Sequence, residues 1–178
     1  MKVVVAGIPG AGKTTVLKEV KGIEIINYGD VMFSIAKKKN LVNDRDEIRK
    51  LPIDEQRKLQ KEAAKFISKK KNVIIDTHCT IKTRDGYMPG LPYEIISIIK
   101  PDFIILIEAD AREIEKRRNK DKDIRERDKE SLEEIEMHQN INRMAAIAYA
   151  TLVNANVKII KNEEGRAKDC AEEIMKVF

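Results

Sequence analysis

Gly7, Gly12, Lys13 and Thr14 have the spacing G-x-x-x-x-G-K-[ST], which is typical of a loop that holds phosphate groups. Glycines let the backbone turn its N–H groups inward, and the N-terminus of a following helix adds partial positive charge toward an anion. Lys13 is expected to reach the β- and γ-phosphates, and Thr14 to place its hydroxyl on Mg²⁺. We therefore predict a nucleoside triphosphate site made of Gly7, Ile8, Pro9, Gly10, Ala11, Gly12, Lys13, Thr14 and Thr15.

Asp76 ends the apolar run VIID, and His78 follows two residues later. A carboxylate at the end of such a strand commonly supports the Mg²⁺ shell of a bound nucleotide. The alternative is that Asp76 caps the loop that follows. His78 could contact a ligand or bond to its own backbone, and the sequence leaves both pairs of alternatives open.

The fate of the bound phosphate depends on what else the chain contains. GTPases recognise guanine with N-K-x-D, but Asn119 and Lys120 are followed by Lys122 instead of aspartate. None of the eight glycines has an aspartate three residues before it, so the D-x-x-G element that senses the γ-phosphate is also missing. The sequence therefore argues against a GTPase and leaves transfer of the phosphoryl group to an acceptor.

A nucleoside monophosphate would be an acceptor that needs no general base, because its phosphate is already mostly ionised at neutral pH. The protein would have to supply a second cationic pocket and exclude water. Cationic side chains form three clusters in the chain, although such charged runs are also typical of a solvated face. The clusters are Arg45 with Arg49, expected on one helix face, Lys82 with Arg84, and Arg117, Arg118, Arg125 and Arg127.

Short apolar runs rich in Ile and Val alternate with helical patterns along the chain. Continuously apolar runs of this length are typical of buried parallel strands covered by helices on both faces. We expect strands at residues 2–6, 23–27, 73–76, 103–109 and 157–161. We expect helices at residues 14–21, 30–39, 54–69, 92–99, 111–118 and 165–178, and a longer one that begins near Ser131, where Ser131 and Glu134 make a capping box. This order predicts an α/β protein with a parallel sheet.

Composition further limits the classes of protein and of ligand that fit this sequence. The chain has 178 residues, which suits one domain, and charged residues make up 37%, against a typical value of about 25%. The net charge of +5 suits anionic ligands, while an aromatic content of 4% argues against a stacking platform for single-stranded nucleic acid. No apolar run is long enough for a membrane span, and Cys79 and Cys170 form no metal or redox motif. We expect a cytoplasmic protein.

Seven blocks of the sequence carry a resemblance to the archaeal-type adenylate kinases, and they are spread over essentially the whole length of the chain. The blocks are GIPGAGKTT, NYGDVMF, DRDEIRKL, IIDTH, GYMPGLP, IRERD and VKIIKNEEG. The resemblance implies the reaction ATP + AMP ⇌ 2 ADP with Mg²⁺. It also implies a P-loop nucleoside-monophosphate-kinase-like three-layer sandwich with a five-stranded parallel sheet. Residues 1–178 would form one kinase domain, with a core of residues 1–29, 71–114 and 145–178, an AMP-binding helical flap at about 30–70 and a short lid at about 115–130.

The resemblance also implies roles for single residues. Residues 7–15 would hold the ATP phosphates, and Thr14 and Asp76 would support Mg²⁺, partly through water. The AMP site would contain Asp30, Arg45, Arg49, His78 and Lys82. Lys13, Arg117, Arg118, Arg125 and Arg127 would serve catalysis and the lid, and Asn162 and Gly165 would lie against the ATP adenine.

Some features depart from the better-known bacterial type or leave alternatives open. Phe33 stands where that type has an arginine, the block DTHCT lacks the arginine of its counterpart, and there is no four-cysteine zinc lid. Members of the resembled family are trimers, and the apolar segment 141–155 is either a core helix or a subunit interface. Two other functions fit the motifs: a kinase for another small acceptor such as CMP or a hydroxyl-bearing metabolite, which would need a base such as Asp30 or Asp76, and an ATP-dependent assembly factor for RNA or protein.

Overall fold

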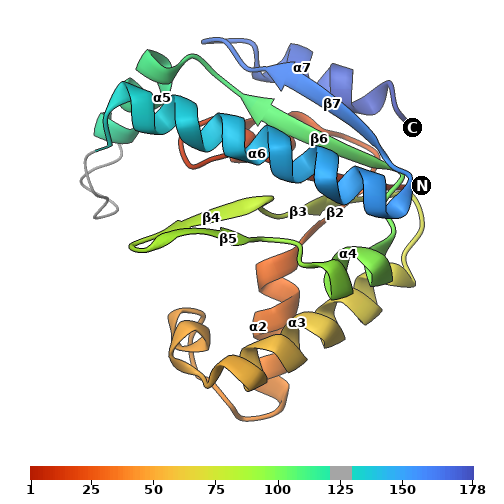
Figure 1. Cartoon of the computed structure of the whole chain (residues 1–178). Helices are drawn as coiled ribbons and strands as arrows, with labels where there is room; N and C mark the ends of the chain where they lie inside the picture. The colour runs from red at the N-terminus through yellow and green to blue at the C-terminus, as the bar shows by residue number, and fades with distance from the viewer. Residues whose placement is uncertain (121–129) are drawn as a thin grey trace.

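Five parallel strands form the central sheet of the computed structural model, which describes residues 1–120 and 130–178 (Figure 1). The strands are β1 (Lys2–Ala6), β2 (Glu24–Asn27), β3 (Val73–Asp76), β6 (Phe103–Glu108) and β7 (Asn156–Lys161). Their order is β2-β3-β1-β6-β7. The predicted α/β fold with a five-stranded parallel sheet is therefore confirmed, and each strand lies within one residue of its predicted bounds.

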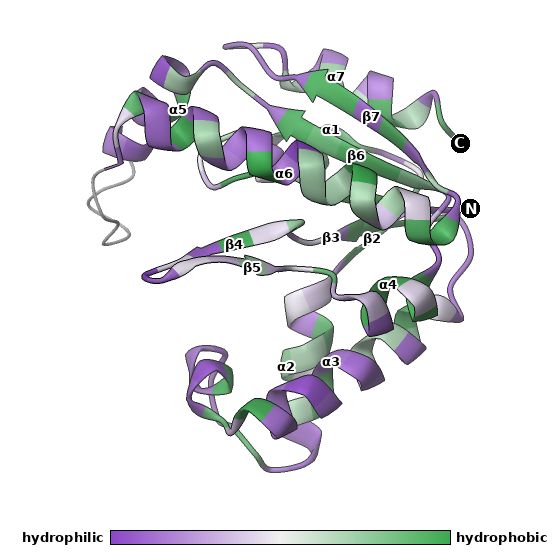
Figure 2. Cartoon of the chain, viewed as in Figure 1, coloured by the Kyte–Doolittle hydropathy of each residue, from purple (hydrophilic) through white to green (hydrophobic). Residues whose placement is uncertain are grey.

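Helices cover both faces of this sheet, which explains why the central strands β1, β3 and β6 are almost continuously apolar. One face buries Val4, Ala6 and Ile75 against the helices α3 (Ile53–Ser68), α4 (Tyr93–Ile99) and α6 (Leu132–Val153). The other face buries Val3, Val5 and their neighbours against α1 (Lys13–Glu19) and α7 (Ala167–Met175). Figure 2 shows β6 as a mainly hydrophobic strand, whereas β7 carries hydrophilic stretches.

The remaining helices begin and end close to where the sequence predicts. They are α2 (Tyr28–Lys38), the short 3₁₀ helix η1 (Asp46–Lys50) and α5 (Ala111–Lys120). The capping box at the start of α6 is confirmed, because Ser131 Oγ accepts from the Glu134 N–H at 3.2 Å and Glu134 accepts from the Ser131 N–H at 2.8 Å. Segment 44–51 contains η1 instead of a longer α-helix.

A two-stranded antiparallel hairpin, β4 (Thr80–Thr83) and β5 (Gly86–Pro89), follows β3 and is absent from the sequence-based prediction. It packs against α6 through a buried polar cluster. The Thr80 hydroxyl donates to Asn142 at 2.6 Å, and His138 Nε2 lies 3.2 Å from the same hydroxyl oxygen. Because the single hydroxyl proton points to Asn142, Nε2 of His138 carries the proton that it donates to Thr80. The cluster fixes one face of the hairpin to α6.

Helix α6 is apolar on two sides, and among residues 1–120 and 130–178 one side is packed against the core while the other carries exposed side chains. Ala146, Tyr149 and Ala150 are buried against the sheet, whereas Met144, Ile147 and Leu152 are each more than half exposed. A helix that belonged entirely to the core of one chain would not leave such side chains in solvent.

Within residues 1–120 and 130–178, none of the helices combines the length and the apolar character that a membrane crossing requires.

Candidate active site

The glycine-rich loop and Asp76 lie at the carboxyl edge of the sheet, where ligands bind in open α/β folds. Residues 7–12 connect the end of β1 to the start of α1. Asp76 ends β3 and is the register partner of both Val5 in β1 and Asn27 in β2. The parallel arrangement of three neighbouring strands thus brings the glycine-rich loop, Asp76 and Asn27 to one edge.

The glycine-rich loop is held from outside by side chains of two other segments. Asn162, which follows β7, is buried and donates through Nδ2 to the Ala11 carbonyl at 2.9 Å. Arg117 of α5 donates to the same carbonyl at 3.2 Å, and Arg118 donates through Nε to the Pro9 carbonyl at 2.8 Å. These bonds occupy backbone carbonyls of the loop. Within the loop the Ala11 N–H donates to the Ile8 carbonyl at 3.2 Å, and N–H groups at the start of a helix that follows such a loop are typical ligands of an anion.

Lys13 and Asp76 form an ion pair at the centre of the site. Their side chains are only 11% and 15% exposed, so the pair is largely desolvated. The other carboxylate oxygen of Asp76 accepts from Asn27 Nδ2 at 2.8 Å. This arrangement holds the Lys13 ammonium beside the loop, and it places a carboxylate within the reach of a cation bound to a phosphate there.

Asn27 links this centre to the first predicted acceptor residues. Its side-chain oxygen accepts from the Asp30 N–H, in the first turn of α2, and from Arg45 Nη2, both at 3.1 Å. Arg45 Nη1 also donates to the Asp30 carboxylate at 2.5 Å. An asparagine before a helix is a recognisable N-cap, but its contacts with Asp76 and Arg45 have no signal in the sequence.

Arg49 does not join Arg45, so the expectation that both guanidiniums share a helix face is wrong. Arg45 precedes η1 instead of lying within a helix, and Arg49 pairs with Asp46 at 3.1 Å with its side chain 83% exposed. The cause is the short 3₁₀ helix, in which residues four apart no longer lie above one another. In this structure Arg45 faces Asn27 and Asp30, and Arg49 faces solvent.

His78 lies in the loop between β3 and β4, beside the Lys13–Asp76 pair. The residue as a whole is exposed to solvent, although protein atoms crowd its ring. The protein that surrounds its ring, and secondarily the Lys13 ammonium, lower the pKa of His78 from its ordinary 6.5 to about 4. His78 is therefore neutral at physiological pH and can act as a hydrogen-bonding group without adding charge.

Lys82 and Arg118 come from different elements and meet at one carboxylate. Lys82, on β4, lies 3.5 Å from Glu130 and 3.1 Å from Glu134. Arg118, at the end of α5, donates to Glu130 at 2.8 Å while it bonds to the Pro9 carbonyl. Lys82, which was predicted for the acceptor site, and Arg118, which was predicted for the lid, therefore contact the same carboxylate. This residue, Glu130, was not predicted as a site residue from the sequence.

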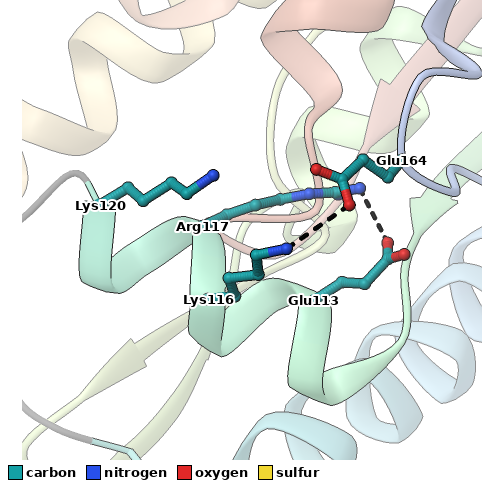
Figure 3. Close-up of a pocket in the computed structure, with 5 residues that line it drawn as sticks. All are labelled: Glu113, Lys116, Arg117, Lys120 and Glu164. Carbon is teal, nitrogen blue, oxygen red and sulfur yellow. Dashed lines mark hydrogen bonds and ion pairs between the residues drawn. The ribbon is translucent and has the colours of Figure 1, made fainter.

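A pocket lies between α5 and the segment after β7, at the far end of the glycine-rich loop (Figure 3). Arg117 crosses its floor and donates to Glu113 at 2.9 Å and to the Asn162 carbonyl at 3.0 Å. On the rim, Lys116 pairs with Glu164 at 3.6 Å. The pocket is lined by Glu113, Lys116, Arg117, Lys120 and Glu164. Gly165 follows this rim directly, in the exposed turn that leads to α7.

The predicted residues are thus divided among three places. The loop, Lys13, Asp76 and His78 lie at the centre, and Thr14 and Thr15 are on the first turn of α1. Arg45 and Asp30 lie on one side, and Arg117, Arg118 and Asn162 lie on the other. Arg125 and Arg127 lie outside the described residues.

Three features together define a P-loop kinase. They are the glycine-rich loop between the first strand and the first helix, the strand order β2-β3-β1-β6-β7, and the cationic side chains at the carboxyl edge of the sheet. Solved structures agree on the fold. The shikimate kinase from Acinetobacter baumannii in complex with shikimate superposes with a TM-score of 0.62 at 17% identity, over 99% of this chain and 91% of that one. Shikimate kinase from Aquifex aeolicus gives 0.53 at 20% identity, over 99% and 95%.

Sequence comparison gives the family. A family model described as an AAA domain matches residues 6–136. Adenylate kinases from Methanopyrus kandleri and Methanothermobacter thermautotrophicus are each 51% identical to this chain; the first alignment covers 97% of the chain and 95% of the relative, the second 99% and 98%. The adenylate kinase from Methanocaldococcus jannaschii is 48% identical, over 99% and 97%. The chain therefore belongs both to the AAA-domain family and to the adenylate kinases, and it is a nucleoside monophosphate kinase.

Proposed function

We propose that the protein catalyses the reversible, Mg²⁺-dependent transfer ATP + AMP ⇌ 2 ADP. The observation that carries this proposal is the continuous line of contacts Lys13–Asp76–Asn27–Arg45. It connects the loop for the donor phosphates with a guanidinium on the neighbouring side of the sheet edge. A reaction between two nucleotides needs cationic groups for two phosphate ends, and this line provides them side by side.

On the donor side, the loop N–H groups and Lys13 bind the ATP phosphates, and the segment 162–165 after β7 lies against the adenine, as the resemblance implies. The braces on the Ala11 and Pro9 carbonyls support this role, because they keep the loop in its anion-binding form before ATP arrives. Positioning of this kind converts transfer into a step between groups that are already aligned. Gly165 allows the chain to turn away behind the adenine.

On the acceptor side, the phosphate of AMP attacks as an ionised nucleophile. Arg45 and Lys82 attract this phosphate, with His78 and Asp30 at the edge of the site and Arg49 at its rim. Asp30 and Asp76 are both engaged in ion pairs with cations. They therefore serve to hold cationic groups, which favours a phosphate acceptor over a hydroxyl acceptor that would need a free base.

The residues present fit a magnesium ion. Thr14 offers a hydroxyl and Asp76 a carboxylate at the same end of the loop, and hard oxygen ligands from one or two side chains together with phosphates are what Mg²⁺ prefers. When bound, the ion would neutralise charge on the β- and γ-phosphates. Lys13 and the arginines neutralise the remainder and help to keep water out.

We assign the domain parts on the basis of the resemblance to the archaeal-type adenylate kinases. Residues of about 30–70, which include α2, η1 and α3, form the AMP-binding flap, and residues of about 115–130 form the lid. Arg125 and Arg127 belong to that lid and supply charge to the transferring group. Arg127→Ala is then expected to lower kcat with little effect on KM, and an Arg127→Ala enzyme with full kcat would remove this residue from the lid.

A homotrimer in the cytoplasm is the proposed working form. The exposed Met144, Ile147 and Leu152 on α6 support it, because contact with a second copy would bury them. Analytical ultracentrifugation of the wild type and of Ile147→Asp tests this point: three chains per particle are expected for the first and a dissociated form for the second, whereas a monomeric wild type would refute the assembly.

The experiment that tests the reaction supplies ADP alone with Mg²⁺ and follows ATP and AMP by chromatography. Equal amounts of both are expected, and Lys13→Ala should abolish their formation because the donor phosphates lose their cation. ATP offered with each monophosphate in turn should show a preference for AMP. Inert ADP combined with ATP hydrolysis that depends on added RNA would support an assembly factor instead.

A further inference from the structure

Glu130 occupies a place between two cations that the reaction would use. Its two carboxylate oxygens are divided between them: Oε2 accepts from Arg118 Nη1 at 2.8 Å, and Oε1 lies 3.5 Å from Lys82 Nζ. Arg118 comes from α5 and Lys82 from the β4–β5 hairpin, so the carboxylate connects two elements that are separate in the chain. A phosphoryl group also presents several oxygens from one centre, so Arg118 and Lys82 would bind it in the same way.

Burial separates this contact from an ordinary surface ion pair. The side chains of Arg118 and Glu130 are 11% and 16% exposed, whereas pairs such as Arg49 with Asp46 are more than 80% exposed. Exposed pairs contribute little to stability. A largely buried charge is costly unless it has a partner, so Arg118 requires an anion at this position whether or not nucleotide is bound.

The position itself is next to the phosphate loop. The guanidinium that binds Glu130 also donates through Nε to the Pro9 carbonyl, within the loop. The Glu130 carboxylate therefore contacts Arg118, which bonds to the glycine-rich loop, and Lys82 of the hairpin at the same time. The Lys13–Asp76 pair shows the same principle at the centre of the site, where a carboxylate pairs with the lysine of the loop.

We infer that Glu130 is a displaceable counter-ion, whose carboxylate holds Arg118 and Lys82 in the free protein and yields both cations to the phosphate groups of the bound nucleotides. The inference rests on the proposed function, since it takes Arg118 and Lys82 as phosphate-binding residues. It assigns Glu130 a positioning role: the residue keeps the cations of two elements in place, and nucleotide binding must compete with it.

Competition of this kind has a measurable consequence. Replacing the carboxylate by the neutral amide of Glu130→Gln removes one negative charge that opposes an incoming phosphate, while the amide oxygen can still accept from Arg118. Two unit charges about 4 Å apart interact by about 1 kcal/mol in water, which corresponds to about a fivefold change in a dissociation constant. Binding of anions should therefore become about fivefold tighter, and the gain should shrink at high salt.

Glu134→Gln is a matched control. Glu134 also contacts Lys82 but is not a partner of Arg118 among the described contacts, its side chain is 51% exposed, and glutamine can replace it in the capping box. Both variants lose one negative charge near Lys82, so a general change in local charge would affect them equally. Only the Glu130 variant is expected to change the affinity for phosphate by more than about twofold.

The test measures the dissociation constants of inorganic triphosphate and of ATP by calorimetry at low and high salt, with the thermal midpoint of each protein alone and with ATP. Glu130→Gln is expected to melt lower without ligand, bind both probes about fivefold more tightly at low salt, and show the larger rise of its midpoint with ATP. A lower midpoint with unchanged or weaker binding would mean a purely structural ion pair and would overturn the inference. Formation of ATP and AMP from ADP by the wild type is scored separately: if it occurs while the two variants bind alike, only the role of Glu130 fails, and if it does not occur, the proposed reaction fails.

Discussion

Gly12→Ala is the substitution for which the structure predicts the clearest penalty. Gly12 has φ +88° just before α1, and a Cβ atom there would lie 2.2 Å from Nδ2 of Asn162 and 3.3 Å from Nη1 of Arg117. Asn162 cannot easily move, because it is buried and its amide is bonded to the Ala11 carbonyl at 2.9 Å. Alanine at position 12 therefore has to break this brace or shift the loop.

The expected loss is the sum of two contributions. A left-handed backbone conformation costs a non-glycine residue about 1–2 kcal/mol, and loss of the Asn162–Ala11 hydrogen bond costs about 1 kcal/mol. Gly22→Ala isolates the first contribution, because Gly22 has φ +79° and nothing lies within 4 Å of the point that an added Cβ atom would occupy. We expect a decrease in the free energy of unfolding of about 2–3 kcal/mol for Gly12→Ala and about 1–2 kcal/mol for Gly22→Ala.

Urea unfolding and the rate of ADP disproportionation measure the two effects. The rate should fall about 100-fold in Gly12→Ala, because a shift of the loop by about 1 Å misplaces the donor phosphates, and should stay at the wild-type level in Gly22→Ala. Adding Asn162→Ala to Gly12→Ala removes the clashing amide, so the double variant should be less destabilised than the sum of the two single variants. Three outcomes would contradict the role of the Asn162 brace. They are equal losses of unfolding free energy in the two glycine variants, strict additivity of Gly12→Ala and Asn162→Ala, and a wild-type rate in Gly12→Ala.

Two further predictions concern the hairpin and its approach to the site. Thr80→Val removes the hydroxyl that donates to Asn142 and accepts from His138, and leaving these buried groups unpaired should lower the free energy of unfolding by about 1–3 kcal/mol in urea titrations; a neutral effect would mean that the cluster does not hold the hairpin. The lowered pKa of His78 means that the folded protein binds fewer protons at this residue than the unfolded chain between pH 6.5 and about 4. Its contribution to stability is therefore fully present above pH 6.5 and is lost as the pH falls toward 4. The free energy of unfolding of His78→Gln should consequently vary less steeply with pH in this range than that of the wild type. An unchanged slope would contradict the lowered pKa of His78.

The regular part of the fold could be predicted from the sequence because each element has its own local signal. Continuous Ile and Val runs indicate strands covered on both faces, and Ser131 with Glu134 marks the start of α6. The order of strands in the sheet has no such local signal, since it depends on which helices pack together across the sheet. Five apolar runs predicted five strands and a parallel sheet, and the resemblance to a known family implied one sheet of five strands.

The β4–β5 hairpin has only a weak signal in the sequence. Arg84 and Asp85 connect the strands and Gly86 follows, and aspartate with glycine between short strands is typical of a hairpin turn. Each strand is only four residues long; β4 is mainly polar, and β5 begins with glycine and ends with proline, so no apolar run marks them. Their stability comes from Thr80 and its contacts with α6, which are tertiary contacts.

The least predictable parts of the site are its counter-ions. Glu130 lies at the end of a charged run in which any acid could pair with any base, and its partners come from α5 and the hairpin. The prediction for Arg49 failed for a related reason, because the helix that would align it with Arg45 is replaced by η1. Residue types could therefore predict that cations are needed, but only the structure shows which ones meet.

The central claim is that two phosphate sites face each other at the carboxyl edge of the sheet, one at the glycine-rich loop and one beside Arg45. The most direct measurement is calorimetric titration with a bisubstrate mimic, in which two adenosines are joined by a chain of phosphates. One mimic is expected to bind per chain, to compete with both ATP and AMP, and to bind much more weakly to Lys13→Ala and to Arg45→Ala. A mimic that competes with ATP alone and binds Arg45→Ala as tightly as the wild type would contradict the central claim.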